Sequence, residues 1–290
     1  MTANKPDCAW SLADLASAPK NGLKVMSTFA CGGGSSMGYK RAGCEVIAAN
    51  DIDPEMAWHY KLNINPKHYF LCPINELLEK KLPEELYSLD ILDGSPPCST
   101  FSMAGSREKA WGKEKHFREG QAKQVLSDLF FDYLNLVGKL KPKVAIAENV
   151  KGMLIGNAKG YTKMVMARFK ELGYRPQLFL LNGAFWPGTK PGHSYADEWL
   201  RLRGKPSGFN MFKLDKQKPS PTLTATDVAR HWNECRKLTY REWKRLGSYP
   251  DDYQAKSNNI GKYMVGMSVP PKMTEQVARA VIDQWLLPKE

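Results

Sequence analysis

A glycine-rich loop between two apolar segments places the strongest constraint on how this chain folds. Residues 24–29 predict a short strand, and residues 30–38 follow it as a loop rich in glycine. Residues 45–50 predict a second strand, which leads into Asp51. This order is typical of a nucleotide-type cofactor unit, because glycines let the backbone approach a ligand and the acid accepts hydrogen bonds from ribose hydroxyls. The loop lacks the G-x-G-x-x-G pattern, so a dinucleotide is not favoured, and a tight strand–helix turn without a ligand is the alternative.

The alternation of strand-like and helix-like segments continues through the first half of the chain. Apolar runs predict buried strands at residues 86–92, 143–147 and 177–181, and helical spacing of apolar residues predicts helices at 121–140 and 161–172. We therefore expect an α/β fold with a doubly wound, mostly parallel sheet and helices on both faces.

Composition narrows the functional class. The formal net charge of +12 favours a polyanionic partner. The 6 cysteines form no C-x-x-C pair, which argues for reduced thiols and against a metal site or a disulfide framework. Residues 1–20 lack the layout of a signal peptide, and no apolar run is long enough to cross a bilayer. We expect a cytoplasmic protein with no membrane partner.

Two chemically capable residues follow neighbouring predicted strands. Cys98 comes directly after Asp93-Gly-Ser-Pro-Pro97, whose prolines stiffen the backbone before the sulfur, and Glu148 follows the strand at 143–147. Open α/β sheets place their chemistry at the carboxyl ends of their strands. A thiolate there can add to an electron-poor ring while a buried acid protonates a ring nitrogen. For a lone cysteine, a small buried residue at a tight turn is the alternative interpretation.

A basic, glycine-punctuated segment follows the cysteine. Residues 99–120 lack apolar periodicity and include Lys109, Lys113, Lys115 and Arg118. We expect this segment to be a functional loop that closes over an anionic substrate, with these side chains on phosphates. A solvated run of charges is the alternative.

Six short motifs occur in an order that resembles the DNA (cytosine-5)-methyltransferases, closest to short bacterial and prophage forms. They are Phe29-Ala-Cys-Gly-Gly-Gly34, Asp51-Ile52, Ser95-Pro-Pro-Cys98, Glu148-Asn-Val150, Arg236-Lys-Leu-Thr-Tyr-Arg-Glu242 and Gly266-Met-Ser-Val-Pro-Pro271. The resemblance implies transfer of a methyl group from S-adenosylmethionine to C5 of cytosine in duplex DNA, within a restriction-modification or prophage setting. The target base must be flipped out of the helix to be reached.

Residue roles follow from the resemblance position by position. Cys98 resembles the nucleophile that adds to C6 of cytosine, and Glu148 resembles the residue that holds N3 and the exocyclic amine. Asp51 would bind the ribose hydroxyls and Ile52 the adenine. The implied cofactor-binding set is Phe29, Cys31, Gly32, Gly33, Gly34, Asp51, Ile52, Ile74, Ser95, Pro97, Leu129, Ser268 and Val269.

The resemblance also implies a division of the chain. Residues 22–184 and 236–287 would form the catalytic domain, and residues 185–235 a small irregular target-recognition lobe that faces double-stranded DNA. We expect a monomer. Two cofactor-side positions, Pro73 and Met267, depart from the pattern of the family.

A larger departure concerns a missing segment. The family carries a Gln-x-Arg-x-Arg run and a strand after the position of residue 181, and this chain continues at once into Phe185-Trp-Pro-Gly188. An internal deletion would remove one strand from the sheet and an arginine that contacts the flipped base. An impaired relative that binds DNA or cofactor without turnover is therefore one alternative function. Cytosine-5 methylation of RNA is a weaker alternative.

Overall fold

The computed structural model describes residues 9–97, 114–115, 124–125, 129–154, 158–180, 212–214, 220, 223–226, 229–234 and 236–287. Within these residues the chain forms a parallel sheet of 5 strands in the order β3-β2-β1-β4-β7. The strands are β1 (Lys24–Thr28), β2 (Glu45–Asp51), β3 (His68–Leu71), β4 (Ile91–Gly94) and β7 (Val144–Ala147). Every strand pair of this sheet is parallel, which confirms the doubly wound α/β fold.

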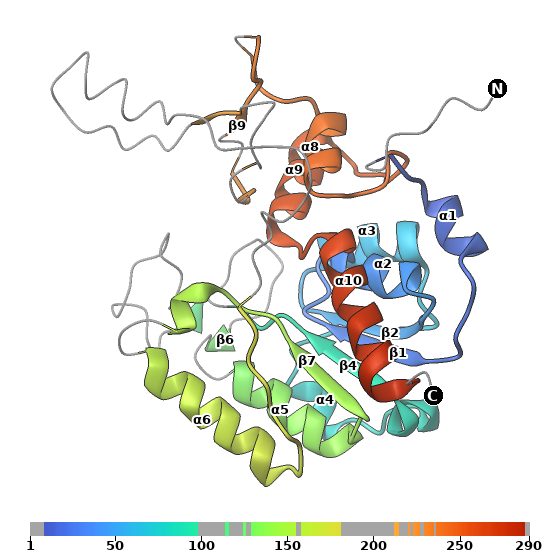
Figure 1. Cartoon of the computed structure of the whole chain (residues 1–290), viewed down its shortest axis with the longest axis vertical. Helices are drawn as coiled ribbons and strands as arrows, with labels where there is room; N and C mark the ends of the chain where they lie inside the picture. The colour runs from blue at the N-terminus through green and yellow to red at the C-terminus, as the bar shows by residue number, and fades with distance from the viewer. Residues whose placement is uncertain are drawn as a thin grey trace, which may run out of the picture.

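Helices cover both faces of the sheet, as Figure 1 shows. The first half supplies α1 (Leu12–Ser17), α2 (Gly34–Arg41), α3 (Pro54–Ile64), α4 (Glu76–Glu79), α5 (Leu129–Leu140) and α6 (Ala158–Glu171). The C-terminal part supplies α8 (Tyr240–Leu246), α9 (Asn258–Met267) and α10 (Pro271–Val281), which continues into a π-helical turn at Ile282–Leu286. Helix α10 packs against α2, so the end of the chain completes the layer begun near its start.

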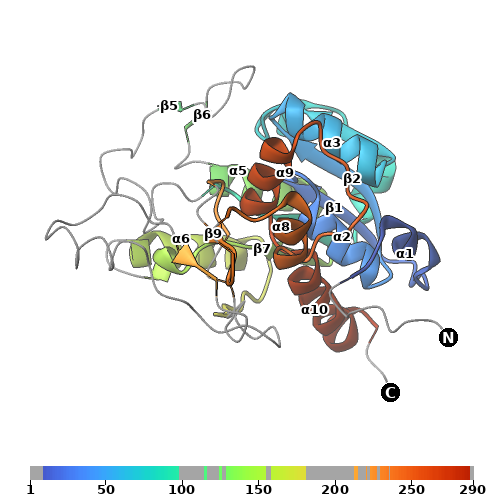
Figure 2. The same cartoon turned by 90° about the horizontal axis from the view of Figure 1, so that it is seen from above.

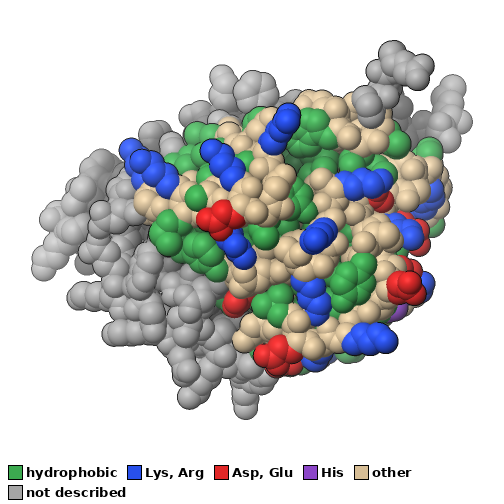
Figure 3. All heavy atoms as spheres, turned by 90° about the horizontal axis from the view of Figure 1, so that it is seen from below, with side chains coloured by type: hydrophobic (Ala, Val, Ile, Leu, Met, Phe, Trp, Pro, Cys, Tyr) green, Lys and Arg blue, Asp and Glu red, His purple; other side chains and the backbone are tan. Residues whose placement is uncertain are grey.

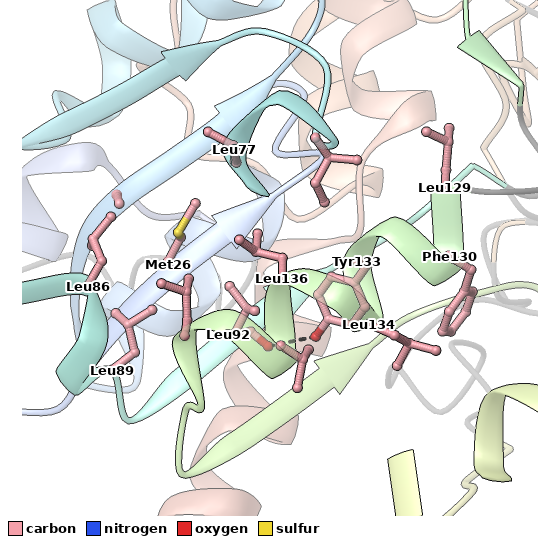
Figure 4. Packing of buried hydrophobic residues seen from close by; sticks show 14 of the residues in the cluster. Met26, Leu77, Leu86, Leu89, Leu92, Leu129, Phe130, Tyr133, Leu134 and Leu136 are labelled. Atoms are coloured by element: carbon pink, nitrogen blue, oxygen red, sulfur yellow. Dashed lines mark hydrogen bonds between the residues drawn. The ribbon is translucent and has the colours of Figure 1, made fainter. Parts of the chain in front are cut away.

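One face of the sheet carries the largest apolar cluster. Met26 and Leu92 project from β1 and β4 into side chains of α5, including Tyr133 and Leu136 (Figure 4). The Tyr133 hydroxyl donates to the Leu92 carbonyl at 2.9 Å and lies 2.9 Å from the Ile146 carbonyl. Tyr133 therefore satisfies its only polar group while its ring fills the core, and it links α5 to both β4 and β7.

The other face packs against α2 and α10. Val25 and Ile91 alternate with the residues of the first cluster and meet Tyr39 of α2 and Ala278 of α10. This two-residue alternation is expected of strands that are buried on both faces. It places Ser27 and Asp93, which oppose each other in the register of β1 and β4, on the α2 side near the carboxyl ends of the strands.

The C-terminal helices α8 and α9 pack against each other, as seen from above in Figure 2, and a third apolar cluster lies between them and the glycine loop. Trp243 of α8 and Met264 of α9 pack with Tyr60 of α3, all three with no exposed surface. A capping box at Thr239 and Glu242 begins α8, which satisfies backbone donors at its first turn.

Two short strand pairs lie outside the main sheet. Strands β5 (Glu114–Lys115) and β6 (Gln124–Val125) pair antiparallel, and β8 (Phe212–Lys213) pairs with β9 (Ala229–Arg230) in parallel. The second pair belongs to the segment expected to form the target-recognition lobe, most of which lies outside the described residues. The proposed division into 22–184, 236–287 and 185–235 stays a prediction.

Two assignments in the middle of the chain are wrong. The apolar run at 86–92 is not one strand, because Glu84–Ser88 forms a 3-10 helix and only Ile91–Gly94 enters the sheet. Leu86 lies in that helical turn and its side chain is buried. A short apolar run alone does not distinguish a strand from a buried helical segment, so the assignment failed. The helix expected at 121–140 begins at Leu129, and Val125 lies in β6.

The strand expected at 177–181 is also wrong for its described part. Residues 177–180 join no strand, and Leu178, Phe179 and Leu180 are 56%, 62% and 61% exposed. Residues of high strand propensity need a neighbouring strand and a covering layer to form a sheet. Within the described residues β7 is therefore the edge of the sheet, and the proposed deletion beyond residue 181 stays a prediction.

On the face seen in Figure 3, lysines and arginines are spread singly among acidic and apolar side chains. No helix in the described ranges is long and apolar enough to cross a membrane.

Candidate functional site

The loop between β1 and α2 has a strained backbone. Phe29 and Cys31 have φ angles of 53° and 45°, in the left-handed region that non-glycine residues rarely adopt. Gly33 has φ 82°, and a Cβ there would lie 1.8 Å from Cδ1 of Ile64, so only glycine fits. Strain of this kind is concentrated at ligand-binding turns, where the surrounding structure holds it in place.

Asp51 holds this loop from the end of β2. One carboxylate oxygen accepts the Cys31 backbone N–H at 2.7 Å, and the other accepts the Asp53 backbone N–H at 2.9 Å. Burial raises the pKa of Asp51, and these backbone donors oppose that shift by stabilising the carboxylate. Each oxygen keeps a further lone pair, so the side chain can also accept hydrogen bonds from a bound ligand.

The segment between α9 and α10 closes over the same loop. A Cβ built on Gly34 would lie 2.1 Å from the Val269 carbonyl oxygen and 3.0 Å from Cβ of Ser268. The Tyr253 hydroxyl donates to the Gly32 carbonyl at 2.7 Å. The structure thus brings Ser268 and Val269 to the glycine loop, although they lie more than two hundred residues later in the sequence. The order of the motifs predicts this contact.

Polar atoms around the loop fit a ligand with several hydrogen-bonding groups. The hydroxyls of Tyr69, Tyr249 and Ser268 are buried and make no hydrogen bond of standard geometry in the described residues, and those of Tyr249 and Ser268 lie close to each other beside Gly34. Tyr69 of β3 pairs with Ala49 of β2, two residues before Asp51, and the charge of Asp51 adds to the effect of burial in raising the pKa of Tyr69. Buried polar groups in this state commonly meet a ligand or water, and S-adenosylmethionine offers ribose, amine and carboxylate partners.

The carboxyl ends of β4 and β7 form the second half of the site. Gly94 pairs with Ala147, and the Glu148 backbone N–H donates to the Gly94 carbonyl at 2.9 Å, so the ladder extends to Glu148. The Asn149 side chain donates to the Pro96 carbonyl at 3.1 Å, and Ser95 Oγ donates to the Phe29 carbonyl at 3.4 Å. Residues 95–97 are thereby fixed between the glycine loop and Glu148.

Cys98 lies outside the described residues, directly after Pro97. The described cysteines are poor candidates for a nucleophile, because burial raises the pKa of Cys31 to about 12 and that of Cys44 to about 11, and it raises the pKa of Cys72 as well. These three side chains stay thiols at neutral pH.

The remaining predicted site residues divide into three groups. Ile52 follows Asp51 at the end of β2 and is partly buried. Ile74 and Leu129 are 2% and 3% exposed and lie in the apolar cluster against which Phe29 packs. Lys109, Lys113 and Arg118 lie outside the described residues, and for Lys115 only the backbone in β5 is described.

One buried residue of the site was missed by the sequence-based reasoning. Asp93 is 4% exposed at the end of β4 and accepts hydrogen bonds from Ser27 Oγ and Tyr39 Oη, both at 3.0 Å. The available signal was an acid inside the short apolar strand that leads to the cysteine loop. No group of three or more His, Cys, Asp or Glu side chains in the described part of the chain could hold a metal ion.

Comparison with known proteins identifies relatives. Type II methyltransferase M.FnuDI of Fusobacterium nucleatum is 33% identical over 160 residues, which are 55% of this chain and 42% of that protein. Type II methyltransferase M.NgoFVII of Neisseria gonorrhoeae is 24% identical over 342 aligned residues, covering 90% of this chain and 87% of that protein. The chain thus spans less than half of the length of M.FnuDI, and of M.NgoPII of Neisseria gonorrhoeae, where the share is 43%.

A solved structure shares the fold. The putative DNA modification methyltransferase encoded within a prophage of E. coli superposes with a TM-score of 0.61 at 16% identity, covering 90% of this chain and 99% of that one. The sequence also matches the family described as C-5 cytosine-specific DNA methylase over residues 23–186 and 193–283. These two ranges include the glycine loop, Asp51, Glu148 and the Ser268–Val269 turn. The chain therefore belongs to the C-5 cytosine-specific DNA methylase family.

Proposed function

We propose that this protein transfers a methyl group from S-adenosylmethionine to C5 of cytosine in double-stranded DNA. The observation that carries the proposal is that two halves of a site lie together at the carboxyl ends of the strands. The glycine loop with Asp51 forms one half, and residues 95–97 with Glu148 form the other. Ser95 and Phe29 join the two halves directly, so a cofactor on the loop would adjoin a base held by Glu148.

The cofactor, when bound, supplies an electrophilic methyl group on a sulfonium sulfur. The chain's own groups would orient it: Asp51 would accept hydrogen bonds from the ribose hydroxyls, and Ser268, which packs against Gly34, would offer its hydroxyl. Each group lacks some of the hydrogen bonds that it can make within the described residues. The glycine loop itself is held rigid by Tyr253 and Ile64, which limits rearrangement on binding.

Cys98 and Glu148 would act on the flipped cytosine. The Cys98 thiolate forms a bond to C6 while the Glu148 carboxyl gives a proton to N3, which makes C5 nucleophilic. After methylation, a water molecule takes the C5 proton, and the electrons of that C–H bond form the C5=C6 double bond as the sulfur–C6 bond breaks. Cys98 leaves as the thiolate, and N3 returns its proton to Glu148. Burial raises the pKa of Glu148, which favours the protonated form that this role needs.

Incubation with labelled S-adenosylmethionine tests the proposed function. We expect label to enter mixed genomic DNA, whose many sequences include the unknown target, and to appear as 5-methylcytosine after hydrolysis. No incorporation into DNA in the presence of measurable cofactor binding would overturn the proposal. Incorporation into tRNA alone would support RNA methylation instead.

A second candidate, an impaired relative without turnover, is favoured by one observation. Residues 177–180 form no strand beside β7, and their apolar side chains are exposed. A sheet that lacks its next strand could also lack support for the substrate base. Cofactor binding without methyl transfer is the outcome that this candidate predicts.

Asp51→Ala should weaken cofactor binding by roughly 100-fold, since two hydrogen bonds to a charged acceptor would be lost. Isothermal titration calorimetry with S-adenosylhomocysteine measures the change. Asp53→Ala is the matched control, because Asp53 caps α3 by accepting from the backbone of Glu55 and Met56. The control should lose about 1 kcal/mol of stability and less than about threefold in affinity. Equal affinity of Asp51→Ala and the wild type would contradict the assignment.

A further inference from the structure

The first described residues cross to the C-terminal part of the chain and form hydrogen bonds there (Figure 1). The Trp10 indole N–H donates to the Ser248 carbonyl at 2.9 Å, and the Trp10 carbonyl accepts the Asp251 backbone N–H at 2.9 Å. The Leu12 backbone N–H lies 2.9 and 3.1 Å from the two oxygens of the Asp252 carboxylate. These contacts join segments from opposite ends of the sequence, so they depend on the tertiary structure alone.

The Trp10 side chain is held firmly in this position. It is 4% exposed and belongs to the same apolar cluster as Tyr249 and Tyr253. The Arg41 guanidinium of α2 lies over its ring, 4.7 Å from the centroid. The indole ring therefore has apolar neighbours, a cation on its face and an acceptor for its N–H, which together fix its orientation.

Trp10 holds one side of the turn at residues 248–253, which we call the tyrosine turn. Ser248 begins this turn with a φ of 56°, in the left-handed region that non-glycine residues rarely adopt. On the other side, the Lys244 ammonium of α8 donates to the Tyr253 carbonyl at 3.2 Å. The tyrosine turn is therefore fixed between α8 and the segment around Trp10.

The two tyrosines of this turn contact the glycine loop. The Tyr253 hydroxyl donates to the Gly32 carbonyl at 2.7 Å. The Tyr249 hydroxyl lies 3.2 Å from the position that a Cβ on Gly34 would take, beside Ser268. Tyr249 and Tyr253 are 0% and 2% exposed, so the tyrosine turn forms a packed wall against the loop.

The glycine loop depends on such support, because its own backbone is strained. Phe29, Cys31 and Gly33 have positive φ angles of 53°, 45° and 82°. Non-glycine residues persist in this region only where the surrounding structure holds them. If the tyrosine turn loosens, a smaller fraction of molecules carries the loop in its binding conformation. The apparent dissociation constant of a ligand then rises by the inverse of that fraction.

We propose that Trp10 is a positioning residue for the cofactor site, which it supports by holding the tyrosine turn against the glycine loop. The inference rests on the proposed function for the identity of the ligand, S-adenosylmethionine. Trp10 acts through Ser248 and Asp251 and takes no part in methyl transfer. Its replacement should therefore weaken cofactor binding and leave the chemical step unchanged.

Trp10→Phe tests the inference, because phenylalanine keeps an aromatic ring and lacks the indole N–H. We expect the affinity for S-adenosylhomocysteine, measured by isothermal titration calorimetry, to fall about fivefold, which corresponds to the loss of one buried hydrogen bond. The KM for S-adenosylmethionine should rise by a similar factor. The kcat at saturating cofactor should change by less than about twofold, since bound cofactor keeps the loop in its binding conformation.

Tyr174→Phe is the matched control for the loss of a hydrogen bond to a backbone carbonyl. The Tyr174 hydroxyl donates to the Pro142 carbonyl at 2.6 Å. Pro142 precedes β7, so this contact lies at the amino ends of the strands, and the glycine loop lies at their carboxyl ends. The control should lose stability and keep the cofactor affinity of the wild type.

Asp252→Ala is a second test that leaves the apolar core intact. Asp252 is exposed and accepts the Leu12 N–H, so its replacement removes another anchor of the same segment. Cofactor affinity should fall by a smaller factor than in Trp10→Phe. This variant provides the test on its own if Trp10→Phe does not fold.

Hydrogen–deuterium exchange without cofactor gives a readout that does not depend on ligand binding. The Gly33 N–H donates to the Ala30 carbonyl at 2.8 Å, so its exchange reports opening of the loop. We expect faster exchange at Gly33 in Trp10→Phe and wild-type exchange in Tyr174→Phe. Unchanged affinity in the folded variants of Trp10 and Asp252, or unchanged exchange at Gly33, would overturn the inference. Faster exchange in a protein whose wild type binds no cofactor would support the coupling and refute the proposed function.

Discussion

Cys98→Ser is expected to abolish covalent capture of DNA that contains 5-fluorocytosine while it leaves cofactor affinity unchanged. The fluorine at C5 cannot depart as a proton does, so an adduct formed by Cys98 persists and migrates as a protein–DNA species on a denaturing gel. A serine hydroxyl is a far weaker nucleophile at neutral pH. Methyl transfer should fall by roughly 10⁴-fold or more, as is typical when a covalent nucleophile is removed.

The described structure supports this expectation, because it holds residues 95 and 96 and the glycine loop in place. Ser95 Oγ donates to the Phe29 carbonyl, and the Pro96 carbonyl accepts from the Asn149 side chain, so residues 95 and 96 are held between the glycine loop and the end of β7. Cofactor affinity should not change, because the glycine loop is held by Asp51 and Tyr253, which the substitution leaves intact.

Cys44→Ser is the matched control for the loss of a thiol. Cys44 is fully buried, its sulfur accepts from Asn21, and burial raises its pKa to about 11. Serine can accept the same hydrogen bond, so this variant should retain capture and methyl transfer. Capture by Cys98→Ser at the level of the wild type would show that another nucleophile forms the adduct.

The parts of the site that the sequence predicted are those set by local order along the chain. A glycine loop must follow β1 for the backbone to turn into α2, and Asp51 must end β2 to reach the Cys31 N–H. The contact of Ser268 and Val269 with Gly34 was accessible only through the order of the family motifs. Local propensity carries no information on a contact of such sequence separation.

The parts that were missed depend on tertiary context. Residues 177–180 have strand propensity but pair with no neighbouring strand in the described residues. Residues 84–88 form a 3-10 helix that buries Leu86, where a strand was expected. Asp93 could not be recognised as a buried carboxylate, because its hydrogen bonds from Ser27 and Tyr39 depend on the packing of β1, β4 and α2. Periodicity predicts which face a residue occupies and leaves its cross-strand neighbour undetermined.

Glu148→Gln should lower methyl transfer by about 10²- to 10⁴-fold, the range typical of a lost general acid, and should stabilise the protein at alkaline pH. Burial raises the pKa of Glu148 above its ordinary value of 4.5. In the pH interval between that value and the raised one, the folded state binds more protons than the unfolded state. Stability therefore falls as pH rises through this interval, and the cost persists above it.

The amide removes this cost because it cannot ionise. The melting temperature of Glu148→Gln should equal or fall slightly below that of the wild type near pH 4.5, and should exceed it at pH 8, when both are followed by circular dichroism. Glu171→Gln is a matched control, since Glu171 is exposed at the end of α6 and pairs only with Arg168 among the described residues. Its melting temperature should follow that of the wild type at each pH, because an exposed pair of this kind contributes little.

The two readouts of Glu148→Gln separate a catalytic acid from a structural one. A buried structural carboxylate that is needed for folding would lose stability when replaced, and its loss of activity would follow unfolding. A carboxyl kept at the site for its proton instead destabilises the fold at the pH where it works, so its removal raises stability as activity is lost. Loss of both stability and activity at pH 8 would contradict the proton-donor role, and full activity with unchanged cofactor affinity would exclude Glu148 from the reaction.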